Sequence, residues 1–569
     1  MEETVQVLSF FLRLVEPFIA IIITVMCFIS LRGSRRREEP LIVLEDEQEE
    51  IGYPVLYWEN SIGRSRNSDI CIQDMTVSRD HAVLLRRNDG WFITDTGSKS
   101  GVYVNGEKVE ERQQVAIGDR IRIGTTCLVL RRASEAGANV SRRNIRKSIP
   151  SPLILAIITL YVSVFAMQTL FNTGAMEAAI CAGAFIAEIW VFFAVSAIAF
   201  KRPNIELEAL AMLLTGTGIM VSTAHNPRQA FVQLAASAVG VGLYFFILWF
   251  IEIPDRVSKW YIIISVLSLV LLASTLVIGT SINGAKNWIV LGPVSIQPSE
   301  FAKIAYIFVG ASTLDVLQTK KSFTMFIAVS ALTIGILVLM SDFGSAVIFF
   351  VTFLIISFMR SGDIKTVILA VTAALLGVVI MLTVKPYIAQ RFEAWGHVWE
   401  YADSSGYQQV NSLIYSASGG MFGVGTGLGW LQYLFASEND LVFCLICEED
   451  GCILALLTAA IIGGFMLYAR GVATRARSTF YSISACSAAG LLVFQAALNI
   501  FGVTDILPLT GVTLPFVSYG GSSLAACWGL LAFIKAADER TYSRHRPKKT
   551  VSSEKPRRST AQDEGFVEI

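Results

Sequence analysis

Runs of about 20 apolar residues, separated by short polar or basic stretches, recur along most of the chain. Crossing the hydrocarbon core of a bilayer takes about 20 residues in a helix. The pattern therefore predicts a mostly α, polytopic membrane helix bundle of about 12 helices plus one N-terminal anchor helix within residues 1–37. The anchor run lies near 8–31, and the others near 152–171, 177–200, 206–223, 229–251, 258–279, 300–317, 323–340, 345–359, 364–384, 441–468, 479–501 and 513–536.

Basic residues gather beside alternate runs and predict how the bundle is oriented. Four arginines at 32, 35, 36 and 37 follow the first run directly. Lys and Arg are enriched in cytoplasmic loops, so residues 40–132 and a disordered tail at 538–569 are predicted to be cytoplasmic. The opposite ends of the runs then face outward, including the long loop at 385–440 and the segment 507–523.

Composition narrows the class of protein. With 569 residues, 53% hydrophobic content and 35 Phe, the chain is too apolar to be soluble at this size. The 46 basic residues balance 46 acidic ones, so net charge says little about partners, and we expect membrane lipids but no nucleic acid. Nine cysteines show no metal-binding spacing. The first run lacks the features of a cleaved signal peptide, so we expect it to be retained.

Residues 40–132 differ from the rest, because short alternating strands there are separated by Asn, Asp and Gly turns. This predicts a small all-β antiparallel sandwich, followed by a basic linker at 133–149. The strands are expected at 55–57, 82–85, 91–93, 102–104, 121–123 and 127–130.

Three blocks within this region, Ile62-Gly63-Arg64, Val77 to His81 and Asp95 to Gly106, resemble the forkhead-associated (FHA) domain family. The resemblance implies a cytoplasmic domain that binds a phosphothreonine protein, with Arg64 and Ser78 as phosphate ligands, Ser100 beside them and His81 as a loop support. Where the family has Asn-Gly-Thr, this chain has Ser100-Gly101-Val102. The alternative is an FHA-fold docking module that no longer recognises phosphate.

Four polar clusters lie at the predicted outward ends of the runs. They are 284–288 with 297–300, 341–345, the loop that ends at 438–440, and 507–523. Polar groups that converge on one side of a bundle mark a candidate site. Each also has a structural alternative: Trp288 as a membrane-interface residue, Asp342 as a helix N-cap, and Lys286 and Arg391 as solvated charges.

The segment 507–523 carries two prolines and three glycines where a helix should begin. Non-helical backbone at membrane depth is tolerated only where protein or water satisfies its polar groups. We therefore expect this segment to line a cavity. The alternative is a kinked helix start with a Gly-Gly packing contact.

Taken together, several motifs between residues 204 and 537 resemble the SEDS proteins, the FtsW/RodA/SpoVE family. They are Gly284 to Trp288, Gln297 to Lys303, Gly406-Tyr407-Gln408, Ser418 to Gly425, Asp440 to Phe443, Glu448 to Gly451 and Leu507 to Ser523. Two helices in residues 150–203 lie outside this core and are expected to be an addition. The resemblance implies a peptidoglycan glycosyltransferase that polymerises lipid II at the outer face of the bacterial cytoplasmic membrane, with a class B penicillin-binding protein, in cell elongation, division or sporulation.

By the same resemblance Asp440 is the catalytic residue, either as general base or as the ligand of a divalent cation, Mg or Mn. Cations that hold the departing diphosphate are expected at Lys286, Lys303 and Arg391. The remaining expected substrate-binding residues are Trp288, Asp342, Glu449, Ser518 and Tyr519. Glu449 is expected to orient the site rather than to react.

Two other functions remain open from the sequence. A transporter (flippase) of lipid-linked precursor would carry ionisable groups through the middle of the membrane, and the runs from 206 onward are nearly free of them. A membrane scaffold that recruits phosphoproteins would explain the FHA domain but not the outward polar clusters.

Overall fold

The computed structural model describes most of the chain. Described are residues 2–33, 41–132, 149–312, 320–375 and 393–538, apart from short gaps at 49–50, 56, 66–67, 88–89, 111, 201, 203, 283–284, 292–293, 362–363, 366, 373–374, 394, 475 and 477. The predicted linker 133–149, the predicted span 364–384 and the predicted tail 538–569 therefore fall largely outside the described residues.

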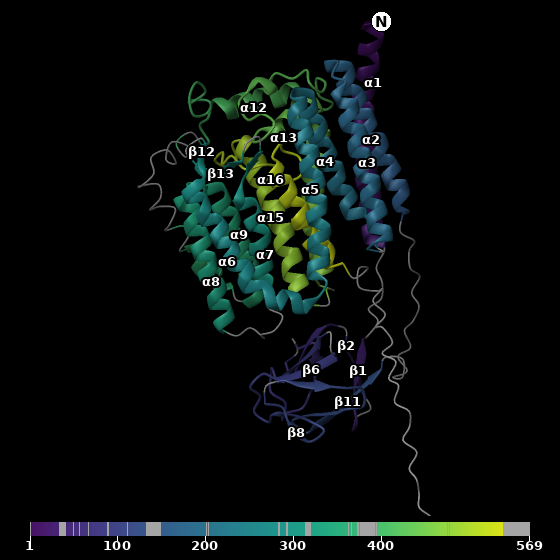
Figure 1. The fold of residues 1–569 in the computed structure, drawn as a ribbon, viewed down its shortest axis with the longest axis vertical. Coiled ribbons are helices and arrows are strands. Elements are labelled where there is room, and N and C mark those ends of the chain that lie inside the picture. The colour runs from purple at the N-terminus through teal and green to yellow at the C-terminus, as the bar shows by residue number, and fades with distance from the viewer. Residues whose placement is uncertain are drawn as a thin grey trace, which may run out of the picture.

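Long helices form a bundle (Figure 1), which confirms the predicted class of fold. Among the described residues, nine helices are long and apolar enough to cross a membrane. The helices are α1 (Glu2–Gly33), α2 (Ser151–Thr173), α3 (Glu177–Ile198), α4 (Glu206–His225), α5 (Pro227–Ile251), α6 (Pro254–Ile278), α7 (Pro298–Ala311), α8 (Lys320–Leu339), α9 (Phe343–Ser361), α12 (Tyr407–Ser418), α13 (Val442–Glu449), α14 (Cys452–Ala473), α15 (Thr479–Val503) and α16 (Gly521–Ala536), with a 3-10 turn η1 (Leu431–Tyr433).

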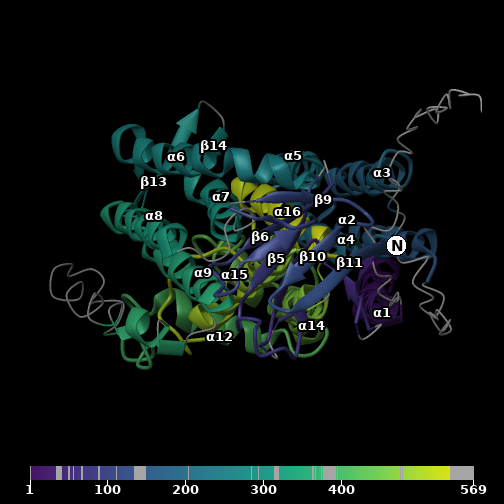
Figure 2. The same ribbon diagram turned by 90° about the horizontal axis from the view of Figure 1, so that it is seen from below.

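The bundle has an enclosed centre. In the most apolar part of α4, 94% of the residues are buried inside the protein, whereas in the most apolar part of α6 only 17% are buried. Seen from one end in Figure 2, α15 and α16 lie between the outer helices α5, α6 and α8. Because α15 lies inside the bundle, its side chains can reach the non-helical segments that enter the bundle from the loops.

Two predicted spans are wrong in detail. The span predicted at 441–468 is broken into α13 and α14 at Gly451, whose φ of 94° is not helical. Glycine is required there, because a side chain would clash with the Met421 carbonyl. The span predicted at 513–536 becomes helical only at Gly521. The residues before it can stay non-helical because side chains of α15 and α5 satisfy their backbone carbonyls.

Two sheets, whose strands pair mostly antiparallel, make up the domain between residues 41 and 132. This confirms the predicted all-β sandwich. One sheet has the order β2-β1-β11-β10-β7-β8 and the other β4-β3-β5-β6-β9, and the apolar core between them is continuous. The strands are β1 (Ile42–Asp46), β2 (Gly52–Val55), β3 (Glu59–Gly63), β4 (Ile70–Cys71), β5 (Ala82–Arg87), β6 (Gly90–Asp95), β7 (Val102–Val104), β8 (Glu107–Lys108), β9 (Gln113–Val115), β10 (Arg120–Ile123) and β11 (Thr126–Arg132).

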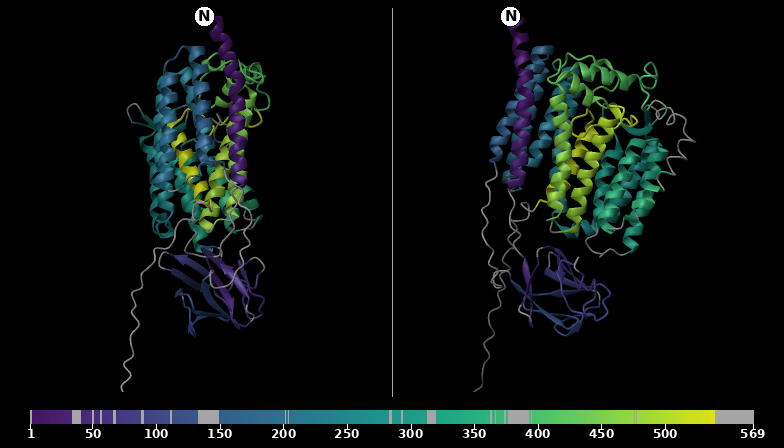
Figure 3. Two further views of the ribbon diagram at one scale, coloured as in Figure 1. Left: turned by 90° about the vertical axis from the view of Figure 1, so that its right-hand side faces the viewer. Right: turned by 180° about the vertical axis from the view of Figure 1, so that it is seen from behind.

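The sandwich and the irregular segments lie at opposite ends of the bundle. The sandwich is found beyond one end, while α12, α13 and a small sheet of β12 (Thr280–Ile282), β13 (Ala285–Leu291) and β14 (Val294–Ile296) lie at the other (Figures 1 and 3). All four predicted polar clusters belong to segments at that second end.

Candidate functional site

The segment between α15 and α16 is held by side chains of α15. The Asn499 amide donates to the carbonyls of Val512 at 2.7 Å and of Asp440 at 2.8 Å. One turn earlier, the Gln495 amide donates to the Thr513 carbonyl at 3.0 Å. These bonds satisfy backbone groups that no helix pairs, so the segment keeps a fixed path inside the protein.

A second set of bonds joins this segment to the residues before α13. The Ser518 hydroxyl donates to the Asn439 carbonyl at 2.6 Å, and the Tyr519 N–H donates to the Glu438 carbonyl at 2.9 Å. From α5, the Gln233 amide donates to the Ser518 carbonyl at 2.9 Å. Ser518 and Tyr519 thus lie beside residues 438–440, where the Ser518 hydroxyl and the Tyr519 backbone N–H bond to backbone carbonyls.

Asp440 lies against the same segment. Gly511 has a left-handed φ of 68°, and a side chain added there would come within 3.4 Å of Asp440 Oδ2. This is an ordinary contact distance, so the carboxylate lies directly beside the Gly511 backbone, whose positive φ favours glycine. Asp440 is half-buried, at the irregular end of the bundle. A carboxylate in this position can accept a proton from a hydroxyl or bind a cation.

Lys303 is buried, with 1% of its surface exposed. Its ammonium donates to Glu300 Oε1 at 2.7 Å and to Gln495 Oε1 at 2.9 Å. Because Gln495 also bonds to Thr513, the charge of Lys303 is connected to the site through one side chain. The structure places Lys303 beneath the site and not on its surface.

Asp342 has the N-cap role that the sequence offered as an alternative to substrate binding, and it also binds two side-chain amides. Its Oδ1 accepts the Ser345 N–H at 3.1 Å, as an N-cap of α9 does. Its Oδ2 accepts the amides of Asn287 at 3.1 Å and Gln297 at 3.3 Å. Gly344, two residues on, lies so close to Val512 that a side chain would clash. Asp342 thus ties the small sheet to the segment that borders Asp440.

Lys286 and Trp288 lie on β13. The Lys286 ammonium donates to the Leu276 carbonyl at 2.6 Å, at the C-terminal end of α6. Trp288 is half-buried, and its carbonyl accepts the Thr280 hydroxyl at 3.1 Å. The ammonium of Lys286 is therefore engaged with helix carbonyls, which its sequence position did not reveal. Arg391 lies outside the described residues.

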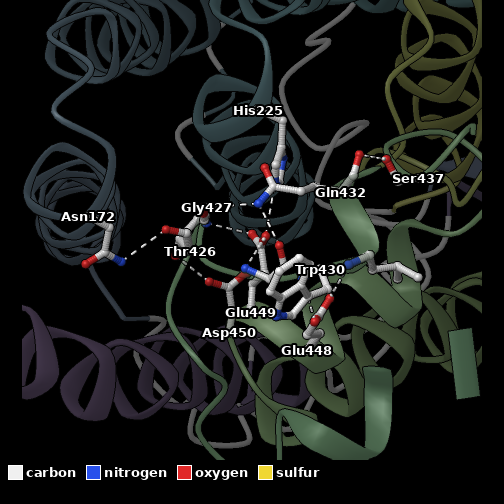
Figure 4. Close-up of polar contacts among 12 residues, drawn as sticks. Asn172, His225, Thr426, Gly427, Trp430, Gln432, Ser437, Glu448, Glu449 and Asp450 are labelled. Atoms are coloured by element: carbon white, nitrogen blue, oxygen red, sulfur yellow. Dashed lines mark hydrogen bonds and ion pairs between the residues drawn. The ribbon is translucent and has the colours of Figure 1, made fainter. Parts of the chain in front are cut away.

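The acidic motif at the end of α13, Glu448 to Gly451, holds a loop by its backbone N–H groups (Figure 4). Glu449 is fully buried and accepts the N–H groups of Gly427 at 2.9 Å and Gly429 at 3.2 Å. Glu448 accepts the N–H groups of Trp430 at 2.7 Å and Leu431 at 2.8 Å. Two adjacent carboxylates thus fix the loop that precedes Asp440.

His225 is a member of this network that sequence reasoning missed. Its Nε2 lies 2.8 Å from Glu449 Oε1, which places a histidine from the end of α4 beside the acidic motif (Figure 4). In the sequence, His225 follows an ordinary apolar run and no spacing relates it to Glu449. Only the packing of α4 against the loop brings them together.

Glu438, two residues before Asp440, has a perturbed carboxyl group. Burial raises its pKa to about 7, and the negative charge of Glu449 adds to the effect, while His225 opposes it. One of its carboxylate oxygens, Oε2, is buried without a hydrogen-bond partner among the described residues. Glu438 therefore changes charge near neutral pH within one turn of Asp440.

We expect the stability of the protein to depend on pH through Glu438. Its carboxyl binds a proton more tightly in the folded state than in the unfolded state, whose ordinary pKa is 4.5, so stability should fall as pH rises from 4.5 to about 7. Glu438→Gln should flatten this fall. The measurement is the unfolding temperature of the purified chain against pH, with the exposed Glu400→Gln as matched control. Parallel curves for wild type and Glu438→Gln would contradict the assignment.

The described residues contain no group of three or more His, Cys, Asp or Glu placed to hold a metal ion. They do offer Asp440 as a single carboxylate at the edge of the site. Mg²⁺ is often bound by one or two carboxylates together with substrate phosphates. A single carboxylate is an incomplete set of ligands, so a cation at Asp440 would need further ligands from a substrate or from water.

The predicted phosphopeptide residues come together at one end of the sandwich. The Arg64 N–H donates to the Ser78 carbonyl at 3.0 Å, and the Ser78 hydroxyl accepts the Lys99 N–H at 3.1 Å. The Ser100 hydroxyl donates to the Thr76 carbonyl at 2.6 Å, so Ser100 supports a loop where the family pattern has Asn. Three loops thereby form one surface that carries a guanidinium and hydroxyls.

Two residues outside this surface hold its loops. His81 is fully buried and lies between the Ser78 N–H at 2.9 Å and the Gly101 carbonyl at 3.2 Å. Burial opposes ionisation of Asp74, but hydrogen bonds from Thr125, Thr76 and Thr126 outweigh it and lower the pKa of Asp74. The loops are thus fixed before any ligand binds.

Comparison with known proteins agrees with the division of the chain into an N-terminal β-sandwich and a membrane helix bundle. Residues 60–124 match the FHA domain family, and residues 204–543 match the FtsW/RodA/SpoVE family of cell cycle proteins. A probable peptidoglycan glycosyltransferase FtsW from Saccharophagus degradans is 33% identical over 360 residues, which cover 59% of this chain and 92% of that protein. The peptidoglycan glycosyltransferase RodA from Mycobacterium tuberculosis is 28% identical, over 54% of this chain and 70% of that protein.

A solved structure agrees too. It is described as "Structural coordination of polymerization and crosslinking by a peptidoglycan synthase complex", and it matches with a TM-score of 0.51 and 25% identity over 60% of this chain and 98% of that chain. The family match spans more than half of the sequence and includes Asp440, the segment 507–523 and the acidic motif. The chain belongs to the FtsW/RodA/SpoVE family and carries an N-terminal FHA domain.

Proposed function

We propose that this chain is a peptidoglycan glycosyltransferase that polymerises lipid II into glycan strands. The observation that carries the proposal is the carboxylate of Asp440, which lies beside Gly511 in a non-helical segment held by Asn499 and Gln495. The names of the relatives, peptidoglycan glycosyltransferases FtsW and RodA, support the same reaction class.

In the proposed reaction, a sugar hydroxyl of the acceptor attacks the anomeric carbon of the donor. The bond from that carbon to the diphosphate oxygen breaks, and the polyprenyl diphosphate leaves with the electron pair. The hydroxyl proton passes to the Asp440 carboxylate, which acts as general base. The fixed backbone around Asp440 keeps the carboxylate in place, so little reorganisation is needed during the reaction.

The departing diphosphate needs positive charge. Lys286 and Lys303 both donate to protein acceptors, so within the described part of the chain they act on this charge at best through their neighbours. In the alternative role of Asp440, the carboxylate would bind a divalent cation, Mg or Mn, together with the diphosphate instead of taking the proton, and the cation would supply the missing charge. Arg391 remains a candidate outside the described residues. Trp288, Asp342 and Glu449 are proposed to shape and position the substrate cavity.

The proposal places the Asp440 end outside the bacterial cytoplasmic membrane and the FHA domain and C-terminus in the cytoplasm. The basic residues after α1 and their enrichment in alternate loops support this orientation. So does the fold, because the sandwich and α13 lie at opposite ends of the bundle (Figure 3). Lipid II would then be used on the outer face and a phosphothreonine protein bound on the inner face.

Buried ion pairs bear on the transporter alternative. Glu300 and Lys303 lie in the first part of α7, and Glu208 at the start of α4 pairs with Lys535 in the last turn of α16. Both pairs lie near helix ends of the core that begins at residue 204, whereas Glu16 and Glu188 lie in the middle of α1 and α3, outside that core. A transporter would be expected to carry such groups through the middle of the membrane, so these two ion pairs of the core do not support the transporter alternative.

The test is glycan-strand synthesis from purified lipid II by the full chain, with and without a class B penicillin-binding protein. The related complex whose description names both polymerization and crosslinking supports including this partner. We expect polymer that is longer or more abundant with the partner present. Absence of polymer under both conditions would contradict the proposal.

For the FHA domain we expect phosphothreonine peptides to bind at Arg64 and Ser78. Loss of a hydrogen bond to a charged group costs about 1.5–3 kcal/mol, so Arg64→Ala should weaken binding by about tenfold or more. The measurement is a titration of the full chain with a phosphothreonine peptide, with the exposed Glu110→Gln as control. Binding by wild type that is indifferent to Arg64→Ala would leave the domain as a docking module.

A further inference from the structure

Trp58 and Glu59, at the point where β3 begins, bring the FHA domain into contact with the membrane bundle. The Glu59 carboxylate accepts the Ser478 hydroxyl at 2.9 Å and the Thr479 hydroxyl at 2.6 Å. It also accepts the Thr479 N–H at 3.3 Å. Ser478 is the N-cap of α15 and Thr479 is its first residue. A carboxylate from another domain thus lies at the positive end of the helix dipole, where negative charge is stabilising.

Trp58 adds an apolar contact at the same place. Its ring lies 5.9 Å from that of Tyr481 in an edge-to-face arrangement, which is a favourable geometry for aromatic pairs. Trp58 packs against the apolar core of the membrane bundle and not against that of the sandwich. The Tyr481 hydroxyl in turn donates to the Ile251 carbonyl at 2.7 Å, at the end of α5. Trp58 is therefore used for contact with the bundle.

The contact is separate from the phosphate-binding surface. Strand β3 begins at Glu59 and ends at Gly63, directly before Arg64. Its pairing with β5 places Glu59 opposite Leu85 and Ile62 opposite Ala82, next to His81. At about 3.3 Å per residue, the two sites are separated by roughly 17 Å along one strand. A peptide at Arg64 would therefore leave the contact with α15 intact.

Helix α15 connects the contact to the candidate active site. From Thr479 to Asn499 it rises by about 30 Å, at 1.5 Å per residue. Its first residue bonds to Glu59, and Asn499 bonds to the Asp440 carbonyl. Gln495 bonds to both Lys303 and Thr513. One continuous helix thus touches the FHA domain at one end and holds the backbone of Asp440 at the other.

We propose that the FHA domain docks on the N-terminus of α15 through Trp58 and Glu59, and that this dock couples the domain to the site around Asp440 through α15. The phosphate-binding loops stay open to a partner protein while the domain is docked. Only the activity measurement below rests on the proposed function. The dock is a contact within the chain and can be tested without it.

Crosslinking tests the dock in the full chain. Glu59→Cys paired with Thr479→Cys should be joined by a short bifunctional thiol reagent. The matched pair Glu107→Cys with Thr479→Cys should not, because β8 lies on the far side of the sandwich from the bundle (Figure 1). The single variants control for native cysteines such as the exposed Cys452. Equal crosslinking of both pairs, or of neither, would overturn the proposed dock.

Hydrogen exchange tests the coupling without lipid II or a phosphopeptide. In Trp58→Ala/Glu59→Gln, amides of residues 479–483 should exchange about tenfold faster or more, and those of residues 436–441 should also exchange faster. Glu107→Gln is the matched control and should resemble wild type. Faster exchange at 479–483 alone would overturn the coupling, and unchanged exchange at both places would overturn the dock as well.

Glycan synthesis gives the independent readout. The double variant Trp58→Ala/Glu59→Gln should polymerise lipid II at about one fifth of the wild-type rate or below, while Glu107→Gln retains the wild-type rate. An unchanged rate in the double variant would overturn the coupling. If wild type itself makes no polymer, the proposed function fails, and crosslinking and exchange still decide the dock and the coupling.

Discussion

Asp440→Asn should abolish glycan-strand synthesis while leaving the protein folded. Asparagine has nearly the volume of aspartate but neither takes a proton nor binds a cation well, and loss of a general base costs about 10²- to 10⁴-fold in rate. The backbone of residue 440 is held by Asn499 and Ala436 through bonds that the substitution keeps. The measurement is the rate of polymer formation from lipid II, with thermal unfolding as the check on folding.

The matched control for this prediction is Asp505→Asn. Asp505 lies near the same end of the bundle, has a left-handed φ of 59° that asparagine tolerates, and accepts the Gly396 N–H at 3.1 Å through an oxygen that asparagine retains. We expect Asp505→Asn to keep most of the wild-type rate. Similar rates for Asp440→Asn and Asp505→Asn would remove Asp440 from the chemistry.

Glu449→Ala should produce the largest loss of stability. Glu449 is fully buried, and the substitution leaves the N–H groups of Gly427 and Gly429 and the ring nitrogen of His225, which are buried or partly buried, without their acceptor. Each buried donor without a partner costs about 1–3 kcal/mol, so the total is a large part of the stability of a domain. The loop before Asp440 should then lose its fixed path, and polymerisation should be lost with it.

Proteolysis and thermal unfolding measure this effect. We expect Glu449→Ala to be cleaved in residues 424–434 under conditions in which wild type resists, and to unfold at a lower temperature. Glu449→Gln should fall between the two, because its amide oxygen still accepts one bond. Glu400→Ala, an exposed glutamate in the preceding loop, is the control and should behave as wild type. Wild-type resistance in Glu449→Ala would show that the loop does not depend on this carboxylate.

The hydrophobic pattern predicted the class of fold well because span length depends on local composition. It did not predict the break at Asp450 and Gly451, because apolar residues continue on both sides of the acidic motif. What makes the break possible is a loop some 20 residues earlier whose N–H groups satisfy Glu448 and Glu449. A pairing of that kind is invisible to a window of neighbouring residues.

The candidate site was predicted in part. The order of the motifs correctly suggested that residues 507–523 and Asp440 belong together, and the bonds between Ser518 and Asn439 show how they do. The partners of the two lysines were not predictable from the sequence, because Lys286 bonds to α6 and Lys303 bonds to α15. His225 and the contact of Trp58 with Tyr481 depend on tertiary packing alone and left no trace in local spacing.

The most direct test of the central claim uses proteoliposomes that contain the full chain and labelled lipid II, with polymer formation and lipid II translocation measured in the same sample. Our account predicts glycan strands made by wild type and by Asp505→Asn but not by Asp440→Asn. Translocation of lipid II without polymer, or polymer made equally by Asp440→Asn, would contradict it.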